Sequence, residues 1–555
     1  MPEEIKESAA EKAKRLSKGL RGSLVESLLD EHTGSLREQD QLLIKFHGIY
    51  QQDDRDRRAE REEKKLDKHY TFMIRLRIPG GSIGPVHYER SQKIAGDYGT
   101  GTLKITTRQT LQVHGIIKSN LKPTIKSFNE VFLDSIAACG DVNRNVVATA
   151  NPASSIHHTE INQLAGEISK LLLPKTRAYY EIWLDQEKIA EKSEDDPLYK
   201  DLYLPRKFKI AIAIPPWNDV DVYANDIGLI AIEEAGKIIG YNVVAGGGLG
   251  TTHGNEKTYP RIATMLGYAS KENVLKFVYE IVTTQRDFGN REDRKLSRLK
   301  YTIDRMGLVN FKSEVEKRVG LTFENEKSFS FQTRSDSFGW AQDHKGLWHF
   351  TLFVENGLVV DSDSYKIKTA LMEVALTRRA IFRFTCNQNV ILSDILPKDL
   401  NLIQAILEKY KLDKIQENTS NIRKNSMACV ALSTCPLALA EGQRYLPLFL
   451  DKLENLMDEC QVKEEAITIR MTGCPNGCAR PYMAEIGLVG TAYGHYNLHL
   501  GADFQGKRLN QKFKENLDEA NILQVLKGIF TQFKSEKNPS ETFGDFCVRK
   551  EFVKA

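Results

Sequence analysis

Long apolar runs are missing from this chain of 555 residues. No stretch approaches the roughly 18 consecutive apolar residues needed to cross a bilayer. The first residues, MPEEIKESAAEKAKRL, lack the apolar core of a secretory signal. Eight cysteines are too few for a disulfide scaffold in a chain of this length. These absences predict a protein of a reducing compartment, the cytoplasm, that is not held in a membrane.

Strong net charge is also missing. The formal charge at pH 7 is +4, from 78 basic and 74 acidic residues. This balance gives no reason to expect a nucleic-acid partner, so any functional positive charge must be local. The length predicts roughly three to four domains, and 41% apolar residues provide for a large core.

A nucleotide-binding loop is the third absence. Glycines cluster in AGGGLG (245–250), but the Lys-Ser/Thr of a phosphate loop does not follow them. Their spacing also differs from the G-x-G-x-x-G dinucleotide fingerprint. The sequence therefore predicts no nicotinamide or flavin site, and electrons for any redox chemistry must arrive from another protein.

The cysteines divide into solitary residues and close pairs. A solitary cysteine is usually a small buried hydrophobic residue, and this is our prediction for Cys139, Cys386, Cys460 and Cys547. The others form a C-x5-C pair in MACVALSTCPLALA and a C-x3-C pair in MTGCPNGCAR. In chain order they are Cys429, Cys435, Cys474 and Cys478. Four thiolates can hold a tetrahedral zinc ion or an iron–sulfur cluster.

Spacing and surroundings favour the cluster. Structural zinc sites are typically built from C-x2-C pairs or Cys/His mixtures, and neither pair has that spacing. The apolar residues around Cys429 suit an electron-transfer centre, because they keep water from the sulfides. Each pair runs into a proline, Pro436 or Pro475, which predicts a helix N-terminus facing the negative cluster. The alternative is a structural zinc site in a non-enzymatic binding protein.

Four blocks of the first half recur in the same order in the second half, which indicates an internal repeat. The matching blocks are ITTRQTLQVHGI (105–116) with FTCNQNVILSDI (384–395), VATANP (147–152) with ALSTCP (431–436), DIGLIA (226–231) with EIGLVG (485–490), and GYNVVAGG (240–247) with HYNLHLGA (495–502). This alignment puts Asn145 and Asn151 in the places of Cys429 and Cys435. We expect a pseudo-twofold axis, with a cluster on one wall of a central crevice and positive charge on the other.

Cationic side chains lie on segments that otherwise read as apolar strands. Side chains alternate between the two faces of a strand, so Arg75 in FMIRLRI and Lys207 and Lys209 in KFKIAIAI lie opposite an apolar face. Each strand taken alone could simply have a solvated cationic face. Collected in one crevice, the cations would need an anion as compensation. Further polar residues of this kind are Arg108, Gln112, His114 and Arg144.

These motifs together resemble one family, the sulfite and nitrite reductases that contain sirohaem and a 4Fe–4S cluster. The resemblance rests on MACVALSTCPLALAE and TGCPNGCAR, preceded by TTRQTLQ, NRNVVATANP and LPRKFK. It extends through KFHGIYQQDDRDRRAER (45–61), RAYYEIWLDQEK (177–188), TTQRDFGNREDRK (283–295) and FGDFCVRK (543–550). It therefore covers nearly the whole chain.

The resemblance implies a role for each group of residues. The ligands of the 4Fe–4S cluster would be Cys429, Cys435, Cys474 and Cys478. The sulfur of Cys478 would also be the axial ligand of the sirohaem iron. The residues that line the substrate-anion site and act in catalysis would be Arg75, Arg144, Lys207 and Lys209. The sirohaem and its carboxylates would be held by Arg108, Gln112, His114 and Arg206.

The implied fold is α+β, with two ferredoxin-like half-domains and two sirohaem/4Fe–4S-type α/β domains related by the pseudo-twofold. The expected parts are an N-terminal arm (1–65), a half-domain (66–137), a sirohaem and substrate domain (138–335), a second half-domain (336–410) and a cluster domain (411–555). The arm could dock a partner or wrap its own subunit. A hydrophilic segment, 185–200, is expected to be an exposed insertion.

The implied activity is the six-electron reduction of sulfite to hydrogen sulfide. Electrons would come from NADPH through a separate flavoprotein subunit that carries FAD and FMN. Ammonia-forming reduction of nitrite uses the same cofactors and is the alternative within the family.

Overall fold

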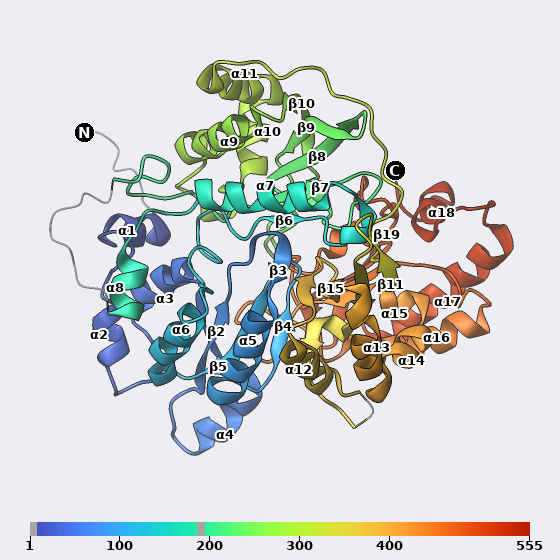
Figure 1. Cartoon of the computed structure of the whole chain (residues 1–555), viewed down its shortest axis with the longest axis horizontal. Helices are drawn as coiled ribbons and strands as arrows, with labels where there is room; N and C mark the ends of the chain where they lie inside the picture. Colours follow the sequence, from blue (N-terminus) through green and yellow to red (C-terminus); the bar gives the residue numbers. More distant parts are fainter. Residues whose placement is uncertain (1–7, 186–194, 364, 555) are drawn as a thin grey trace.

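The computed structural model describes residues 8–185, 195–363 and 365–554. Most of the insertion expected at 185–200 lies outside these residues. Four five-stranded sheets form the framework, and Figure 1 shows the second half of the chain, yellow to red, beside the blue and green first half. The predicted α+β architecture with an internal repeat is confirmed. In the described part of the chain, no helix has the length and apolarity to span a membrane.

The first two sheets have the same strand order and are antiparallel throughout. One consists of β1 (Ile49–Asp53), β2 (Tyr70–Arg75), β5 (Leu111–Ile116), β4 (Leu103–Ile105) and β13 (Leu358–Val359). The other consists of β11 (Gly339–Gln342), β12 (Trp348–Leu352), β15 (Val390–Ile395), β14 (Ile381–Phe384) and β3 (Ser82–Ile83). Each half therefore gives one short edge strand to the sheet of the other half.

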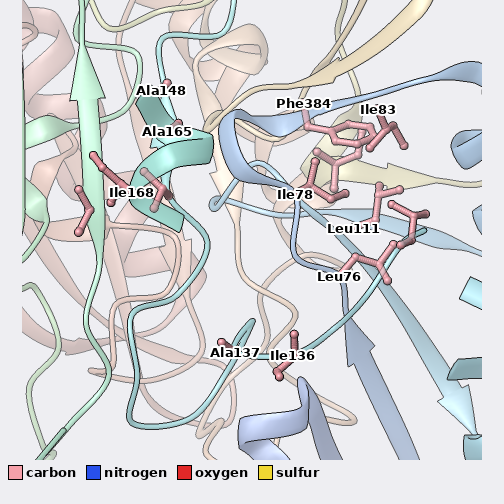
Figure 2. Packing of buried hydrophobic residues seen from close by; sticks show 14 of the residues in the cluster. Leu76, Ile78, Ile83, Leu111, Ile136, Ala137, Ala148, Ala165, Ile168 and Phe384 are labelled. Atoms are coloured by element: carbon pink, nitrogen blue, oxygen red, sulfur yellow. The ribbon is translucent and has the colours of Figure 1, made fainter. Parts of the chain in front are cut away.

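This strand exchange joins the halves through a shared apolar core. Ile83 of β3 pairs with Phe382 of β14, and the ring of Phe382 stacks on Tyr88 with centroids 4.1 Å apart. Figure 2 shows Ile83 beside Phe384, with Ile78 close to them in the same buried cluster. The helices that accompany these two sheets are α5 (Pro85–Tyr98), α6 (Leu121–Asn129), α12 (Ile367–Thr377) and α13 (Leu400–Lys409).

The other two sheets also share one strand order, with three parallel strands followed by two antiparallel ones. The third sheet is β6 (Val147–Ala148), β7 (Ile210–Ala213), β8 (Ile227–Glu234), β9 (Lys237–Ala245) and β10 (Thr264–Ser270). The fourth is β16 (Ser426–Ala428), β17 (Ile469–Thr472), β18 (Ile486–Ala492), β19 (His495–Leu500) and β20 (Gln511–Leu517). Central parallel strands are buried on both faces, which explains the continuous apolar run of β7.

Further helices surround these sheets and form the N-terminal segment. They are α1 (Ala9–Arg15), α2 (Leu24–Leu29), α3 (Glu38–Leu43), α4 (Arg58–Glu63), α7 (His158–Leu171), α8 (Ala178–Leu184), α9 (Val274–Phe288), α10 (Leu299–Met306), α11 (Leu308–Val319), α14 (Leu412–Asn418), α15 (Asn421–Lys424), α16 (Leu446–Glu459), α17 (Glu519–Glu536) and α18 (Phe543–Arg549).

The N-terminal segment wraps its own subunit. Glu11 forms an ion pair with Arg291 at 2.7 Å, and Arg55 donates to the backbone oxygens of Cys435 and Ala438. The segment also supplies β1, an edge strand of the first sheet. These contacts fit the second of the two expectations for this segment.

The repeat extends to individual turns. Gln109 and Gln388 occupy the same place before β5 and β15, and both have left-handed backbones with φ of 50° and 70°. Each amide N–H donates to the carbonyl oxygen of a threonine three residues earlier, Thr106 or Thr385, at 3.1 Å. A positive φ is uncommon for residues other than glycine, so its recurrence confirms the match of these blocks.

One equivalence predicted from the sequence is wrong. Ala148 pairs with Ile212, and Ala428 pairs with Met471 at the same position of the fourth sheet. The next residues, Thr149 and Cys429, are therefore counterparts, and Asn145 is not the counterpart of Cys429. The second half has four more residues between Cys429 and Pro436 than the first half has between Thr149 and Pro152. An alignment that matches the two prolines therefore shifts the preceding strands by four residues.

A buried ion cluster joins the halves where their equivalent segments meet. Asp221 and Arg480 each lie six residues before the matching strands β8 and β18, and Arg480 Nε donates to Asp221 Oδ2 at 2.6 Å. Arg470 contacts the same oxygen at 2.6 Å, and Arg334 lies 3.6 Å from Oδ1. Burial alone would raise the pKa of Asp221, but the three guanidinium groups together lower it.

We predict that Asp221→Ala destabilises the protein strongly, because it leaves three buried arginines without their shared counterion. Breaking a buried ion pair in this way costs about 3–5 kcal/mol. The urea midpoint of the holoprotein, followed by tryptophan fluorescence, should fall accordingly. Asp458→Ala is the control, since the Asp458 side chain is 67% exposed. Equal midpoints for the two variants would contradict the prediction.

Candidate functional site

Two neighbouring parallel strands bring the cysteine pairs together. Cys429 follows β16 directly, and Cys474 lies two residues beyond the end of β17. Because β16 and β17 run parallel, their carboxyl ends lie at the same edge of the sheet. Cys435 and Cys478 follow in the two loops. The structure thus places all four predicted cluster ligands at one edge.

Backbone and amide donors face the sulfur atoms. The N–H of Gly473 donates to Cys429 Sγ at 3.4 Å, and Asn476 Nδ2 lies 3.6 Å from Cys474 Sγ. A Cβ at Gly473 would lie 2.5 Å from the oxygen of Ala440, so only glycine allows this approach. Donors of this kind stabilise negative charge on thiolate sulfur.

The thiols influence one another electrostatically. Burial and the neighbouring Cys478 raise the pKa of Cys435 to about 11, and they raise the pKa values of Cys429 and Cys474 as well. These thiols therefore keep their protons until a metal centre displaces them. Within the described ranges, no three His, Cys, Asp or Glu side chains are close enough to share one metal ion.

The helices predicted at the two prolines are not formed. Pro436 and Pro475 lie in turns, and the next helices along the chain begin at Leu446 and at Pro481, the latter a short 3-10 helix. The loops contain too many positions that leave helical geometry, such as Gly477 with φ of +63°. Individual N–H groups, and not helix termini, therefore face this centre.

A cationic cavity borders Cys478. Its wall includes Cys478 from the second half together with Arg108, Lys207, Lys209 and Arg298 from the first half. Arg108 donates to Asn225 Oδ1 at 2.6 Å and to the oxygen of Ile210 at 3.0 Å, while its buried Nε has no partner among the described residues. The crevice expected between the halves therefore exists, with a thiol on one wall and cations on the other.

The two lysines of this cavity are strongly perturbed. Burial lowers the pKa of Lys207 to about 7, with further lowering by Arg206, Arg144 and Arg298. Burial and the adjacent Lys207 lower the pKa of Lys209 well below its usual value. Each lysine would gain its proton more readily beside an anion.

Arg75 and Arg144 meet around a tyrosine and a cysteine. Arg144 Nη2 donates to the hydroxyl of Tyr50 at 3.2 Å, and Arg75 Nη1 lies 3.1 Å from Cys139 Sγ. Both guanidinium groups lower the pKa of Tyr50, which burial raises more strongly. Arg144 also acts electrostatically on Lys207, so this group adjoins the cavity without forming part of its wall.

Gln112 and His114 extend the same group along β5. Gln112 pairs with Arg75 across the sheet. With its side-chain amide oriented so that the oxygen faces Arg75, this oxygen accepts from Arg75 Nε at 3.0 Å. Its nitrogen then donates to His114 Nε2 at 3.2 Å. Burial, Lys104 and Arg75 lower the pKa of His114 to about 3, so the ring is neutral at pH 7.

Burial and Arg294 lower the pKa of Arg206 to about 10.

Sequence reasoning missed several residues of the site. Arg298 lines the cavity and forms an ion pair with the buried Asp226 at 2.8 Å; its position in a basic segment gave no distinguishing signal. Thr107 Oγ1 donates to the backbone oxygen of Cys478 at 3.1 Å. Cys139 is buried as expected for a solitary cysteine, but it contacts a site arginine. Only the tertiary contacts reveal that position.

Comparisons with known proteins match most of the chain. The family described as "Nitrite and sulphite reductase 4Fe-4S domain" matches residues 165–323. The one described as "Nitrite/Sulfite reductase ferredoxin-like half domain" matches residues 63–131 and 341–410. The first of these matches lies in the half of the chain without the paired cysteines. The paired cysteines lie in the structural repeat of that segment, in the second half.

Full-length relatives are similar throughout. A protein of Leptospira biflexa is 66% identical over 550 residues, covering 99% of both chains, and is named "Sulfite reductase [NADPH] hemoprotein beta-component". A protein of Staphylococcus haemolyticus with the same name is 49% identical, covering 100% of this chain and 97% of its own. The solved structure of the Mycobacterium tuberculosis NirA protein has the same fold, with a TM-score of 0.78 and 23% identity, over 98% of this chain and 97% of that one. The chain therefore belongs to the nitrite and sulphite reductase family, and within it to the sulfite reductase hemoprotein beta-components.

Proposed function

We propose that this chain reduces sulfite to hydrogen sulfide in a six-electron reaction, at a sirohaem coupled to a 4Fe–4S cluster. The observation that carries the proposal is the position of Cys478. Its thiol belongs to the group of four cysteines and also borders the cationic cavity. One sulfur atom can therefore contact both cofactors.

The residues present fit both cofactors. The four thiols influence one another, yet no three of them have the close spacing of ligands to a single ion. The C-x5-C and C-x3-C spacing of these cysteines suits a polynuclear cluster better than structural zinc, which is typically held by C-x2-C pairs. The cavity combines Arg108, Lys207 and Arg298 with an unpartnered guanidinium N–H. This wall suits a tetrapyrrole that carries carboxylates.

When bound, the two cofactors supply single electrons and a metal centre for the substrate anion. The protein's own part is to bind the anion, orient it and provide protons. Guanidinium groups suit planar, multi-oxygen anion contacts, which is the role we assign to Arg75 and Arg144. Lys207 and Lys209 are the proton donors we propose, since a pKa near 7 favours general-acid catalysis at neutral pH.

The remaining site residues would position these groups. Arg108 and Arg206 would bind the carboxylates of the tetrapyrrole, and Gln112 and His114 would hold Arg75 in place. The proposed division of the chain is an arm (1–65), half-domains at 66–137 and 336–410, and sirohaem and cluster domains at 138–335 and 411–555, with β1 of the arm completing the first ferredoxin-like sheet.

We infer that electrons come from a separate NADPH-oxidising flavoprotein subunit. The name "beta-component" of the relatives implies a second component, and the sequence offers no dinucleotide loop of its own.

All eight cysteines are free, which fits a cytoplasmic location.

The choice of anion tests the proposed function. With a reduced viologen as an artificial electron donor, we expect one sulfide for every six electrons and a higher kcat/KM for sulfite than for nitrite. The measurement is anaerobic turnover of the purified holoprotein with each anion. A preference for nitrite, with ammonia as product, would assign the chain to the other activity of the family.

Removal of single cysteines tests the cluster. Cys429→Ser, Cys435→Ser and Cys474→Ser should each lower the bound iron and inorganic sulfide, because each removes one thiolate ligand. Cys478→Ser should also change the sirohaem absorption in the visible spectrum. Cys460→Ser is the control and should keep full iron content. A colourless protein with zinc alone, even after anaerobic reconstitution with iron, sulfide and the tetrapyrrole, would refute the proposal.

The pH profile tests Lys207. A lysine whose pKa is lowered to about 7 is protonated below that pH and loses the proton as the pH rises through it. We expect kcat/KM to fall about tenfold per pH unit above this point. Lys207→Arg keeps a cation that does not titrate in this range, so its kcat/KM should be lower at pH 6 and lack this fall. The ionisation of sulfite affects both proteins equally, and superimposable profiles would argue against proton donation by Lys207.

A further inference from the structure

A second cavity occupies the place in the first half that corresponds to the cysteine centre. The strand pairings make Thr149 the counterpart of Cys429. The segments before β8 and β18 match without gaps, so Asp219 is the counterpart of Cys478 just as Asp221 is that of Arg480. The repeat thus has oxygen-bearing side chains where the cluster half has sulfur.

The cavity is small, with room for about one water-sized group, and oxygen-bearing side chains line it together with the apolar Trp217 and Ile391. Its wall joins Asp219, on the loop after β7, to Asp336, on the segment that leads to β11. The hydroxyl and amide side chains around these carboxylates include Asn151, Ser154, Ser335 and Thr351.

The two carboxylates differ in how well they are satisfied. Asp336 accepts from Thr385 Oγ1 at 2.6 Å, from Asn389 Nδ2 at 2.7 Å and from Asn387 Nδ2 at 3.1 Å. Asp219 is only 6% exposed and accepts from the N–H of Ala150 at 2.9 Å through Oδ2. Its Oδ1 is buried and has no hydrogen bond of good geometry in the described part of the chain, although the Thr149 hydroxyl approaches the carboxylate and lowers its pKa.

No basic side chain is among the residues that line this cavity. The guanidinium of Arg480 lowers the pKa of Asp336 slightly, but it is already paired with Asp221 at 2.6 Å. Burial, and after it the field of Asp336, raise the pKa of Asp219 to about 7. Asp219 is buried and Asp336 is half-buried, so a cation held between them would compensate both carboxylates.

We propose that this cavity binds one hard divalent cation of the calcium class, through Asp219, Asp336 and the surrounding hydroxyl and amide oxygens. Ca²⁺ accepts six to eight oxygen ligands, including waters, in flexible geometry. Two carboxylates with neutral oxygens are therefore a sufficient protein contribution. Sulfur ligands select iron and other soft metals, whereas oxygen ligands select hard ions, so the duplicated sites would hold different metals.

A cation here would also tie the two halves of the molecule together. Asp219 lies two residues before Asp221, whose carboxylate holds Arg470 and Arg480 of the second half. Asp336 is bound by the turn at Thr385–Asn389, next to β15 of the second half. The ion would therefore bridge the β7 loop and the second ferredoxin-like sheet.

The test is metal binding to the complete holoprotein. After dialysis against metal-free buffer, the protein is equilibrated at pH 7.5 with Ca²⁺ or with Mg²⁺ alone, and bound metal is measured by elemental analysis with iron as the internal standard. We expect one Ca²⁺ for each chain and a higher thermal midpoint in its presence, since a ligand of the native state stabilises it. Asp219→Asn and Asp336→Asn should each weaken Ca²⁺ binding about tenfold or more.

Asp458→Asn is the matched control, because the Asp458 side chain is 67% exposed on α16 and no residue of that helix lines this cavity, and it should bind Ca²⁺ like the original protein. The proposal is overturned if neither ion binds stoichiometrically at millimolar concentration, or if both Asn variants bind it unchanged. A third outcome would also overturn it: Asp219→Asn raises the thermal midpoint at pH 7.5, while Ca²⁺ does not change the midpoint of the original protein. In that case a proton, and not a metal ion, neutralises the Asp219 carboxylate. Iron content is read in the same samples, so a failure of this site is distinguishable from a failure of the cluster.

Discussion

The contact between Asp221 and Arg480 is the interaction on which the arrangement of the halves depends. These residues are counterparts in the repeat, both are buried, and their ion pair joins the two halves. Arg480 also donates to the backbone oxygens of Thr107 and Cys386. Thr107 in turn donates to the oxygen of Cys478. The ion pair therefore positions the loop that carries Cys478.

The exchange of edge strands supports the same geometry. β3 and β13 cross between the first two sheets, so neither half can complete its sheet alone. The resulting rigid contact lets the first half present cations to a cavity whose other wall belongs to the second half. Burial first, and the neighbouring cations after it, lower the pKa values of Lys207 and Lys209 in this cavity.

Duplication gave the two halves one backbone plan and different chemistry. Equivalent positions carry Cys429 and Thr149, or Cys478 and Asp219, on matching strands and loops. Sulfur and oxygen ligands favour different metals, so a change of side chain at a fixed backbone position is enough to change the function of a site. The first half contributes most of the basic residues of the cavity wall, Arg108, Lys207, Lys209 and Arg298, and Arg480 adds one from the second half.

Local patterns in the sequence predicted the repeat, the four paired cysteines and the cationic strands, and the resemblance to the family implied the α+β class. Spacing and alternation are local properties and survive in any correct fold. Tertiary structure decided which residues meet. It made Thr149, and not Asn145, the structural counterpart of Cys429. It also formed turns at Pro436 and Pro475 and placed Cys139 in contact with Arg75. It also paired Asp221 with Arg480. Such contacts join segments up to several hundred residues apart. They depend on strand register, loop geometry and packing, and no local sequence pattern encodes these.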